Sequence, residues 1–577
     1  MTEIIIGIDL GTTNSVAAVL EGGEARVIPT AEGNNLCPSV VGFTPSGECV
    51  VGEIAKRQLL THPARTLASV KRHMGSSFTF TVDGRVYTPQ EISAFILRKL
   101  RQDVEDYLGM TVSKAVITVP AYFSDAQRQA TKDAGRIAGL EVVRIVNEPT
   151  AAALAYGEDH HQPHRVLVWD LGGGTFDVSI LEIGEGLCQV LATNGDTRLG
   201  GDDWDGRLMN YCINIFREQE GIDLATDRLA LQRLKQAAEA AKIQLSDELI
   251  TTISLPFLAA KDGKPAHLNI NLSRVQFEAL THDLRDRMVG PTVQALEDAR
   301  LSIDQVEQVL LVGGSTRMPA VRRMVKEMLH NDSVAGVNPD EVVALGAAIQ
   351  GGIVNGMLSQ ILLLDVTPLS LGIETANGIF TRIIPRNSTI PTSETKIFTT
   401  SADNQAAVDI HVLQGERDLA VYNKSLGRFA LRGVPPAPKG YPRIGVTFDI
   451  DENGIAHINA VERSTGVQQQ VTLTPGSAEH DEEVQRMMAD AELFASIDRE
   501  VIELTELQRK GEDVIDNINK KLDTLGDLVP IPELARFDSA LLRMRAALQN
   551  DSAPELRAAL DTCQDLYRGM VAFEIGV

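Results

Sequence analysis

The chain has 577 residues, of which 44% are hydrophobic and 23% are charged, a balance typical of a globular protein with several domains. Its formal net charge of −24 at pH 7 would repel a phosphate backbone, so the composition argues against a nucleic-acid partner. The five cysteines are widely scattered and form no CxxC pair or zinc-type cluster, which favours a reducing compartment.

The first residues predict no targeting signal. They lack a basic segment, and an acidic residue follows almost at once, unlike a secretory signal peptide. The uncharged stretch Val342–Leu364 is long enough to span a bilayer, but glycines and polar residues interrupt it and no Lys or Arg flanks it. We therefore expect a buried helix followed by a linker, in a cytoplasmic protein with no membrane partner.

Residues 1 to about 358 alternate between strand and helix patterns, which is typical of α/β layers. The expected elements are a buried strand at Ile4–Asp9, a hairpin of Ser15–Leu20 and Ala25–Ile28, an Ala-rich helix at Leu229–Leu245, a strand at Val309–Val312 and a helix from about Pro319. From Leu362 to Leu473, short alternating segments and frequent turn residues predict a compact antiparallel β domain. From about His480, helical spacing predicts an all-helical tail that Pro530 and Pro532 interrupt.

One short phrase occurs twice, as "GIDLGTTNS" at Gly7–Ser15 and as "WDLGGGTFDVS" at Trp169–Ser179, each time after an apolar strand. The glycines permit a tight turn whose backbone amides and Thr hydroxyls can face phosphate oxygens, and the leading Asp can hold Mg²⁺ through water. Either phrase alone is equally compatible with an ordinary Gly-rich turn. A third phrase, Gly313–Pro319, joins a strand to a helix whose N-terminus can contact an anion. No P-loop or GxGxxG string is present.

Longer strings extend this pattern: "VPAYFSDAQRQATKDAG" from Val119, "VNEPTAAALAYG" from Val146, "GDTRLGGDDWD" from Gly195, "ILLLDVTPLSLGIET" from Ile361 and "NKSLGRF" from Asn423. With them, essentially the whole chain closely resembles the seventy-kilodalton heat-shock chaperone family of the DnaK type. The resemblance implies a multidomain protein. It would have an α/β actin-like (duplicated ribonuclease H-like) ATPase domain at 1–358, a linker at 359–366, an antiparallel β-sandwich peptide-binding domain at 367–479 and an α-helical lid at 480–577.

The resemblance also implies a function, namely an ATP-dependent chaperone of the stress response that binds exposed hydrophobic segments of unfolded proteins. It implies ATP or ADP with Mg²⁺ and K⁺ as cofactors. As partners it implies client polypeptides, a J-domain co-chaperone and a nucleotide exchange factor of the GrpE type. Two alternatives stay open: a nucleotide-sensing, exchange-factor-like relative with little hydrolysis, and a sugar kinase on the same core.

The resemblance assigns roles at the nucleotide site. Lys71 would orient the attacking water, although a lone lysine is more often a solvated surface residue. The catalytic residues would be Lys71, Glu148, Asp170 and Thr175, and the metal carboxylates Asp9, Asp170 and Asp177. The nucleotide contacts would be Asp9, Gly11, Thr12, Thr13, Gly172, Gly173, Gly174, Asp177, Gly200, Gly201, Glu239, Lys242, Ser246, Gly313, Gly314, Ser315, Arg317 and Asp340. For Glu239, Lys242 and Ser246, spacing alone is also compatible with an exposed helix face.

The resemblance assigns roles beyond the nucleotide site as well. Interdomain coupling would use Pro120, Arg128, Leu362, Leu363, Leu364 and Asp365, although Ile361–Asp365 can equally be a buried strand. The peptide site would be lined by Ile373, Ala376, Phe398, Ser401, Val408, Ile410 and Ile444. For an isolated apolar residue on a strand, plain core packing is the simpler interpretation.

The sequence departs from the DnaK pattern at two places. Ala376 and Ser401 stand where a Met and an Ala often arch over the peptide, so we expect a more open arch.

At the lid latch, Lys439 stands opposite Glu512 in place of an Arg, and Asp516 stands where a His would face Asp403. We expect a weaker latch, because two carboxylates repel and Lys lacks the bidentate geometry of Arg. Peptide dissociation rates of the Ala376→Met and Asp516→His variants test both expectations, since unchanged rates would contradict them. The long acidic tail common in the family, and an insertion after Gly75 that some relatives have, are missing from this sequence.

Overall fold

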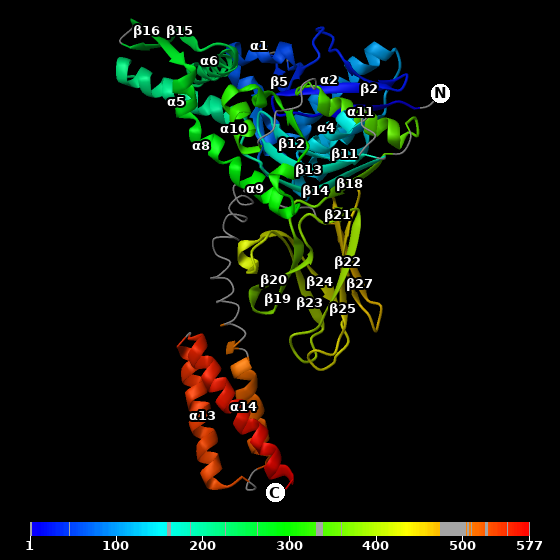
Figure 1. Cartoon of the computed structure of the whole chain (residues 1–577), viewed down its shortest axis with the longest axis vertical. Coiled ribbons are helices and arrows are strands. Elements are labelled where there is room, and N and C mark those ends of the chain that lie inside the picture. Colours follow the sequence, from blue (N-terminus) through cyan, green and yellow to red (C-terminus); the bar gives the residue numbers. More distant parts are fainter. Residues whose placement is uncertain are drawn as a thin grey trace. The chain divides into compact units, whose positions relative to one another are not determined.

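The structure is a computed structural model that describes residues 3–44, 47–157, 163–184, 186–225, 227–261, 264–329, 338–358, 361–472, 504, 507–508, 510–525, 529–550 and 552–575 (Figure 1). The chain divides into two compact units. The first comprises Met1–Leu371, Ile383–Ile410 and Leu426–Gln485, and the second comprises Gly372–Arg382, His411–Ser425 and Arg486–Val577. The domain boundaries expected at 358, 366 and 479 stay predictions.

A first mixed sheet lies at the start of the chain. Its strands, in spatial order, are β11 (Glu141–Asn147), β10 (Lys114–Val119), β1 (Ile5–Asp9), β2 (Asn14–Glu21) and β3 (Glu24–Ile28), with β4 (Cys37–Pro38) also paired to β2. Strand β1 pairs antiparallel with β2 and parallel with β10. The predicted strand at Ile4–Asp9 and the predicted hairpin are therefore both present, and the turn between β1 and β2 carries Gly11, Thr12 and Thr13.

A second mixed sheet repeats this plan. Its spatial order is β17 (Gln308–Val312), β12 (His164–Leu171), β13 (Phe176–Gly184), β14 (Leu187–Asp196), β18 (Leu362–Val366) and β21 (Thr389–Ile390). Strand β12 pairs antiparallel with β13 and parallel with β17, as β1 does with β2 and β10. The two copies of the Asp-Leu-Gly phrase thus occupy the same position in two sheets of like connectivity, which is what a duplicated fold predicts.

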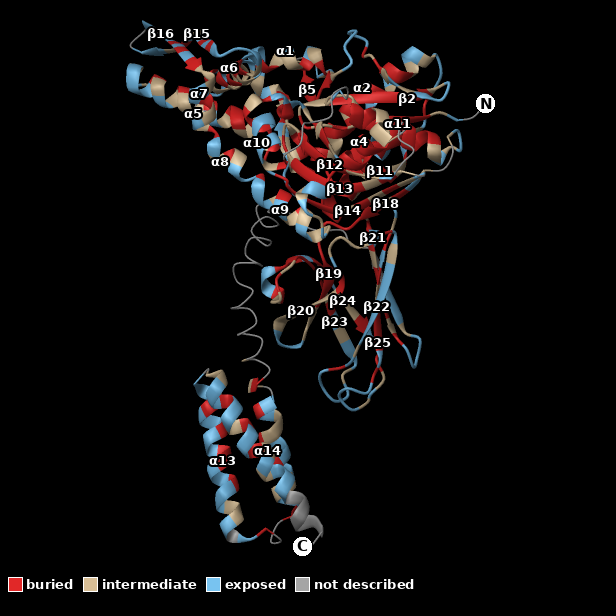
Figure 2. Cartoon of the chain, viewed as in Figure 1, coloured by how far each residue is buried: buried red, intermediate tan, exposed pale blue. Residues whose placement is uncertain are grey.

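Helices cover the faces of these sheets, so most sheet residues are buried (Figure 2). They are α1 (Glu53–Thr61), α2 (Pro89–Leu108), α3 (Asp125–Ile137), α4 (Glu148–Gly157), α5 (Gly201–Glu220), α6 (Arg228–Asp247), α7 (Arg274–Leu280), α8 (His282–Asp286), α9 (Val289–Asp298), α10 (Pro319–Leu329) and α11 (Val342–Val354). The predicted helices at Leu229–Leu245 and from Pro319 correspond to α6 and α10. The hairpin β15 (Ile250–Lys261) and β16 (Lys264–Ser273) extends beside α6.

Helix α11 explains the uncharged stretch that could have spanned a membrane. It packs so closely against α4 that a Cβ at Gly346 would lie 1.8 Å from the carbonyl oxygen of Ala151. A larger side chain there would force the two helices apart. In the described part of the chain, no helix combines the length and apolarity that crossing a bilayer requires. The buried-helix interpretation of Val342–Val354 is confirmed.

Smaller strand pairs and turns complete the α/β region. They are β5 (Val40–Phe43) with β6 (Cys49–Val51) and β7 (Thr66–Ala68), and β8 (Phe80–Val82) with β9 (Arg85–Tyr87). The short 3₁₀ helix η2 (Val70–His73) follows β7 and carries Lys71.

The region after β18 is rich in strands, as predicted. One four-stranded sheet has the order β20 (Ile379–Ile384), β19 (Leu371–Thr375), β23 (Ala407–Gln414) and β24 (Lys424–Arg432). The other has the order β22 (Thr392–Phe398), β25 (Ile444–Ile450), β26 (Ala456–Glu462) and β27 (Gln468–Thr472), with every neighbouring pair antiparallel.

The described C-terminal part is helical. Residues 510–525, α13 (Ile531–Gln549) and α14 (Ala553–Ile575) share an apolar core that includes Ile518, Phe537, Met544 and Leu556. Pro530 caps α13 and Pro532 lies in its first turn, where the backbone N–H has no helical partner, so these prolines separate helices as predicted. The helical spacing expected from His480 to Ile497 lies outside the described residues.

Candidate functional site

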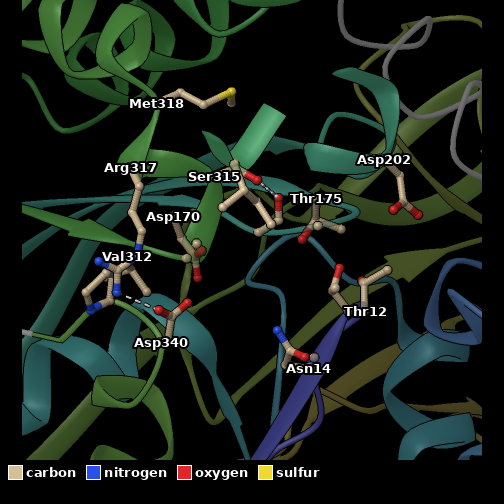
Figure 3. Close-up of a pocket in the computed structure, with 18 of the residues that line it drawn as sticks. Thr12, Asn14, Asp170, Thr175, Asp202, Val312, Ser315, Arg317, Met318 and Asp340 are labelled. Atoms are coloured by element: carbon tan, nitrogen blue, oxygen red, sulfur yellow. Dashed lines mark hydrogen bonds and ion pairs between the residues drawn. The ribbon is translucent and has the colours of Figure 1, made fainter. Parts of the chain in front are cut away.

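A cavity of about 870 Å³ lies between the two halves of the α/β region, at the turns that carry the repeated phrase. Both turns line it, together with residues of η2, α5, α6 and α11 and of the loop after β17. In Figure 3, Thr12 and Thr175 point from opposite sides toward the same space. The cavity has the volume of a site for a small molecule of nucleotide size.

The two Gly-rich turns touch each other. A Cβ added at Gly173 would lie 2.0 Å from Thr13 Oγ1, and one added at Gly174 would lie 2.7 Å from Thr12 Oγ1. Real side chains do not approach this closely, so glycine at these positions is what lets the turns meet. Because the turns come from two different sheets, they line one cavity from two sides.

Lys71 is buried and lines the cavity. Its Nζ forms an ion pair with Glu148, the first residue of α4, and lies 5.6 Å from the centroid of the Phe123 ring. The Lys71 side chain is only 7% exposed, so the interpretation as a solvated surface lysine is wrong. A buried ammonium needs such a partner, because leaving it unpaired would cost several kcal/mol.

Residues on either side of Lys71 tie η2 to the second half of the α/β region. Ser69 Oγ donates to Asp202 Oδ2 at 2.7 Å. Arg72 Nη2 donates to the Gly174 carbonyl oxygen at 3.1 Å and to Asp203 Oδ2 at 2.5 Å. The position of Lys71 is therefore fixed by contacts to the second Gly-rich turn and to the start of α5.

Three aspartates gather around the Lys71–Glu148 pair. Burial and the charge of Glu148 raise the pKa of Asp9 to about 7, and the same two causes raise the pKa of Asp177 to about 7. Burial raises the pKa of Asp170 well above its usual range, and the charges of Glu148, Asp177 and Asp9 add to this. One lysine cannot neutralise so many buried carboxylates, so the cluster calls for a further cation.

The donor set fits Mg²⁺ held through water. Carboxylate oxygens are the ligands this ion prefers, and it usually keeps several of its own waters. Among the described residues, no three His, Cys, Asp or Glu side chains come close enough together to hold a metal directly. Asp177 Oδ1 accepts the Tyr122 N–H at 3.0 Å, whereas its Oδ2 is buried without a hydrogen-bond partner. Asp9 and Asp170 both line the cavity and are the residues that would hold the hydrated ion.

Further polar side chains of the cavity lining come from α6 and from the segments after β17. Lys242 of α6 donates to Asp205 Oδ2 at 2.9 Å and to the Gly201 carbonyl oxygen at 3.0 Å. Arg317 forms an ion pair with Asp340 at 2.6 Å, which Figure 3 shows beside Val312. These contacts leave oriented side chains around an open space.

Most predicted nucleotide residues line this one cavity. Those that do are Asp9, Gly11, Thr12, Thr13, Lys71, Glu148, Asp170, Gly172, Gly173, Thr175, Glu239, Lys242, Ser246, Gly313, Gly314, Ser315, Arg317 and Asp340. Gly174, Asp177, Gly200 and Gly201 do not line it, although the three glycines contact residues of the lining or one another. A Cβ at Gly200 would lie 2.4 Å from Gly174 N, and one at Gly201 would lie 2.7 Å from Ser315 Oγ. The spacing Glu239, Lys242, Ser246 therefore marks a cavity-facing side of α6.

Several cavity residues escaped the sequence reasoning. They include Asn14, Asp202, Asp205, Val312, Met318 and Arg322. Asp205 positions Lys242, and burial raises the pKa of Asp205 to about 6 against the opposing charge of Lys242. The signal that could have found Asp202 and Asp205 is the acidic string directly after Gly200 and Gly201, at the start of a helix. Met318 lies within the third phrase, Gly313–Pro319, but the sequence reasoning assigned it no contact. No local pattern marks Val312, which reaches the cavity because β17 pairs with β12.

The segment expected to couple the domains is a strand in this structure. Strand β18 pairs parallel with β14, opposing Leu362 to Leu187 and Leu363 to Cys188, and Asp365 opposes Ile390 of β21. Leu363 and Asp365 are buried, whereas Leu362 is exposed. The strand is confirmed, although only part of it is buried, and a role of the segment in signalling stays a prediction.

Arg128 connects this strand to a turn of the β-rich region. Its Nη2 donates to Asn147 Oδ1 at 2.6 Å, and Asn147 in turn hydrogen-bonds the side chain of Asp365. Its Nη1 donates to the carbonyl oxygen of Asn453 at 3.4 Å, in the turn between β25 and β26. Pro120 is buried and directly follows β10, five residues before Asp125, the first residue of α3.

The predicted peptide-binding residues lie on or next to the strands of the β-rich region. Phe398 of β22 is opposed to Ile444 of β25. Ile373, Ile410 and Ile444 are buried, Phe398 and Val408 are half-buried, and Ala376 and Ser401 are exposed. Their role in peptide binding stays a prediction.

At the predicted latch, Asp403 Oδ1 accepts the backbone N–H of Lys439 at 2.7 Å. Glu512 and Asp516 are exposed on the helical stretch 510–525. The latch itself stays a prediction.

The comparison with known families agrees with these features. A family model described as Hsp70 protein matches residues 5–83 and 79–572, which is nearly the whole chain. The match runs through both Gly-rich turns, strand β18 and the β-rich and helical regions. The chain belongs to the Hsp70 family.

Proposed function

We propose that this chain is an ATP-dependent chaperone of the DnaK type, in which ATP binding and hydrolysis switch a peptide-binding domain between open and closed states. Hsp70 proteins are in general ATPases that bind ATP or ADP with Mg²⁺, and they act on client polypeptides with co-chaperones. The observation that carries the proposal is the contact of the two Gly-rich turns above the buried Lys71–Glu148 pair.

The chemistry would be hydrolysis of the terminal phosphate of ATP, a reaction that needs positioning and neutralised charge more than covalent catalysis. Mg²⁺, when bound, neutralises negative charge on the phosphate groups. Asp9 and Asp170 would hold the hydrated ion from the two turns. Thr12, Thr13 and Thr175 would donate hydroxyl hydrogen bonds to phosphate oxygens.

Lys71 and Glu148 would together position the attacking water. Lys71 lies within ion-pair distance of Glu148, so its ammonium can stabilise negative charge while the carboxylate accepts a hydrogen bond from water. Asp170 and Thr175, which line the cavity, would lie beside this water, with Asp177 nearby. At the nucleoside end, Glu239, Lys242, Ser246 and Arg317 would contact the ribose and base. A K⁺ ion beside the phosphates is part of the proposal.

The coupled cycle rests on β18 and the β-rich region. In the proposal, β18 stays paired with β14 in one nucleotide state and is released in the other, and Pro120, Arg128 and Asp365 relay the change. The closed state would grip an extended apolar peptide between Ile373, Phe398, Val408, Ile410 and Ile444, below the arch of Ala376 and Ser401. A J-domain protein and a GrpE-type exchange factor would regulate the rate of the cycle in the cytoplasm.

Single-turnover ATP hydrolysis with and without an unfolded peptide tests the proposal. Faster hydrolysis in the presence of peptide supports the chaperone. ATP binding without hydrolysis would support a nucleotide-sensing, exchange-factor-like relative, and turnover that depends on an added sugar would support a kinase. The buried, paired state of Lys71 and the presence of Asp170 and Thr175 favour hydrolysis over sensing.

A further inference from the structure

Three polar side chains form a hydrogen-bonded line across three neighbouring strands of the second unit. They are Glu374 of β19, His411 of β23 and Ser425 of β24. Glu374 Oε2 lies 2.6 Å from His411 Nδ1, and His411 Nε2 lies 2.8 Å from Ser425 Oγ. A hydroxyl bonded to one imidazole nitrogen, with a carboxylate on the other, is the arrangement that activates a serine in acyl-transfer enzymes.

The line lies on the outer face of its sheet. Side chains alternate between the two faces of a strand, and each of the three residues is next to a buried aliphatic residue. These neighbours are Ile373, Ile410 and Leu426, all at most 4% exposed. Ser425 itself is exposed, whereas only 14% of the His411 side chain is. A small reagent can therefore reach the hydroxyl while the imidazole behind it is held in place.

The carboxylate fixes the orientation of the imidazole. With Nδ1–H donating to Glu374, the neutral His411 presents the lone pair of Nε2 to the Ser425 hydroxyl, as a general base must. Glu374 Oε2 stays within hydrogen-bond distance of Nδ1 and so holds the ring in place while His411 takes the proton. Both requirements of an activated serine are met by residues whose strands are adjacent in the sheet.

We propose that Ser425 is a nucleophilic serine that accepts an acyl group from small activated esters. Ser425 Oγ attacks the carbonyl carbon as His411 Nε2 takes the hydroxyl proton. The bond from the carbonyl carbon to the leaving oxygen then breaks, and the leaving alcohol departs with that proton from His411. The products are an acyl ester on Ser425 and one free alcohol. This site is separate from the nucleotide cavity, so its failure or success leaves the proposed ATPase untouched.

The test is acetylation of the full-length chain by p-nitrophenyl acetate, followed by release of p-nitrophenol and by mass spectrometry of the digested protein. Ser401 is the internal reference, because it is also exposed but its Oγ is bonded to the Gln405 amide oxygen at 3.3 Å, not to an imidazole. We expect acetyl-Ser425 to form at least tenfold faster than acetyl-Ser401, because general base catalysis contributes roughly 10²–10⁴-fold in enzymes.

Two variants separate activation from mere exposure. His411→Gln should reduce the acetylation rate of Ser425 at least tenfold, and Glu374→Gln should reduce it by a smaller factor, with acetylation of Ser401 unchanged in both. Circular dichroism identifies which variants keep the β structure, and either folded variant decides the question. Equal labelling of Ser425 and Ser401 in the unmodified chain, or an unchanged Ser425 rate in a folded variant, would overturn the proposal and leave the line of residues as a cross-strand structural bridge.

Discussion

At the scale of single residues, the buried ion pair of Lys71 and Glu148 links stability to function. Both partners are at least 90% buried, so neither charge can be solvated if the other is removed. Their surroundings contain Asp9, Asp170 and Asp177, whose raised pKa values reflect burial and mutual repulsion. The pair is thus the positive centre of an otherwise acidic site.

Replacing Lys71 with Met should abolish ATP hydrolysis, because the water would lose its positioning ammonium. It should also destabilise the α/β region by about 3–5 kcal/mol, the usual cost of leaving one buried charge alone. Single-turnover hydrolysis and urea unfolding of the variant measure the two effects. The matched control is the double variant Lys71→Met, Glu148→Gln, which should recover much of the stability but none of the activity. Equal loss of stability in both variants would contradict this account.

The pKa of Glu462 is lowered, whereas the pKa values of the aspartates around Lys71 are raised. Burial opposes its ionisation, but hydrogen bonds from the hydroxyls and backbone amides of Ser464 and Thr465 outweigh it and lower the pKa of Glu462 to about 2. A carboxylate with a lowered folded pKa stabilises the fold above its unfolded pKa, near 4.5, and loses that contribution as the pH falls toward 2. The turn after β26 should therefore weaken in acid.

Glu462→Gln should remove this pH dependence and cost about 1–3 kcal/mol at neutral pH, the usual contribution of hydrogen bonds to a charged group. Amide hydrogen exchange at Ser464 and Thr465 measures the local stability of this turn, as protection factors between pH 6 and pH 3. Glu394→Gln, at an exposed position of β22, is the control and should change nothing. Protection in the unmodified chain that is independent of pH would count against the assigned role.

At the scale of elements, the contact between the two Gly-rich turns decides whether they act as one site. Each turn follows a buried strand, and the antiparallel pairing of β1 with β2 and of β12 with β13 sets its direction. The absence of a Cβ at Gly173 and Gly174 then allows them to meet. The hydroxyls of Thr12 and Thr13 in one turn and of Thr175 in the other thereby line one cavity.

Gly173→Ala should weaken ATP and ADP binding at least tenfold, because its methyl group would lie 2.0 Å from Thr13 Oγ1 and must displace that hydroxyl or separate the turns. The control is Gly172→Ala in the same turn. The nearest heavy atom to its Cβ would be Thr175 O at 3.8 Å, an ordinary contact. Isothermal titration with ADP and Mg²⁺ measures both affinities. If the two variants bind ADP equally well, contact between the turns is not what builds the site.

At the scale of the whole molecule, β18 is the segment where the α/β region continues into the β-rich region. It lies between β14 and β21 in one sheet, and the Arg128–Asn147–Asp365 chain joins it to the core. Leu362 is 57% exposed and Leu363 is 9% exposed, as alternation in a strand requires. The two leucines therefore offer a matched test of strand docking.

Leu363→Asp should abolish the stimulation of ATP hydrolysis by peptide and leave basal hydrolysis within about twofold, because a carboxylate in the buried position disfavours pairing of β18 with β14. Leu362→Asp should keep the stimulation, since that side chain already faces solvent. Steady-state hydrolysis with and without an unfolded peptide measures both. Equal stimulation in the two variants would show that docking of β18 does not carry the signal.

The sequence alone predicted much of this molecule, because the informative patterns are local. Strand β1, the hairpin after it, helix α6 and the helix starting at Pro319 follow from periodicity, turn residues and caps within short windows. The two Asp-Leu-Gly phrases could be read the same way, as turns with phosphate-facing groups. The long strings around them indicated the family that the family model then matched over nearly the whole chain.

Tertiary structure alone decided which residues meet. Lys71 and Glu148 are distant in sequence, and a lone lysine looks like a surface residue until α4 and η2 bury it. Asp205, Val312 and Met318 join the cavity only through helix and strand packing, and Glu374, His411 and Ser425 line up only because β19, β23 and β24 are neighbours. The physical reason is that periodicity and capping act over a few residues, whereas burial, pKa shifts and hydrogen bonds between sheets depend on long-range pairing that no local pattern encodes.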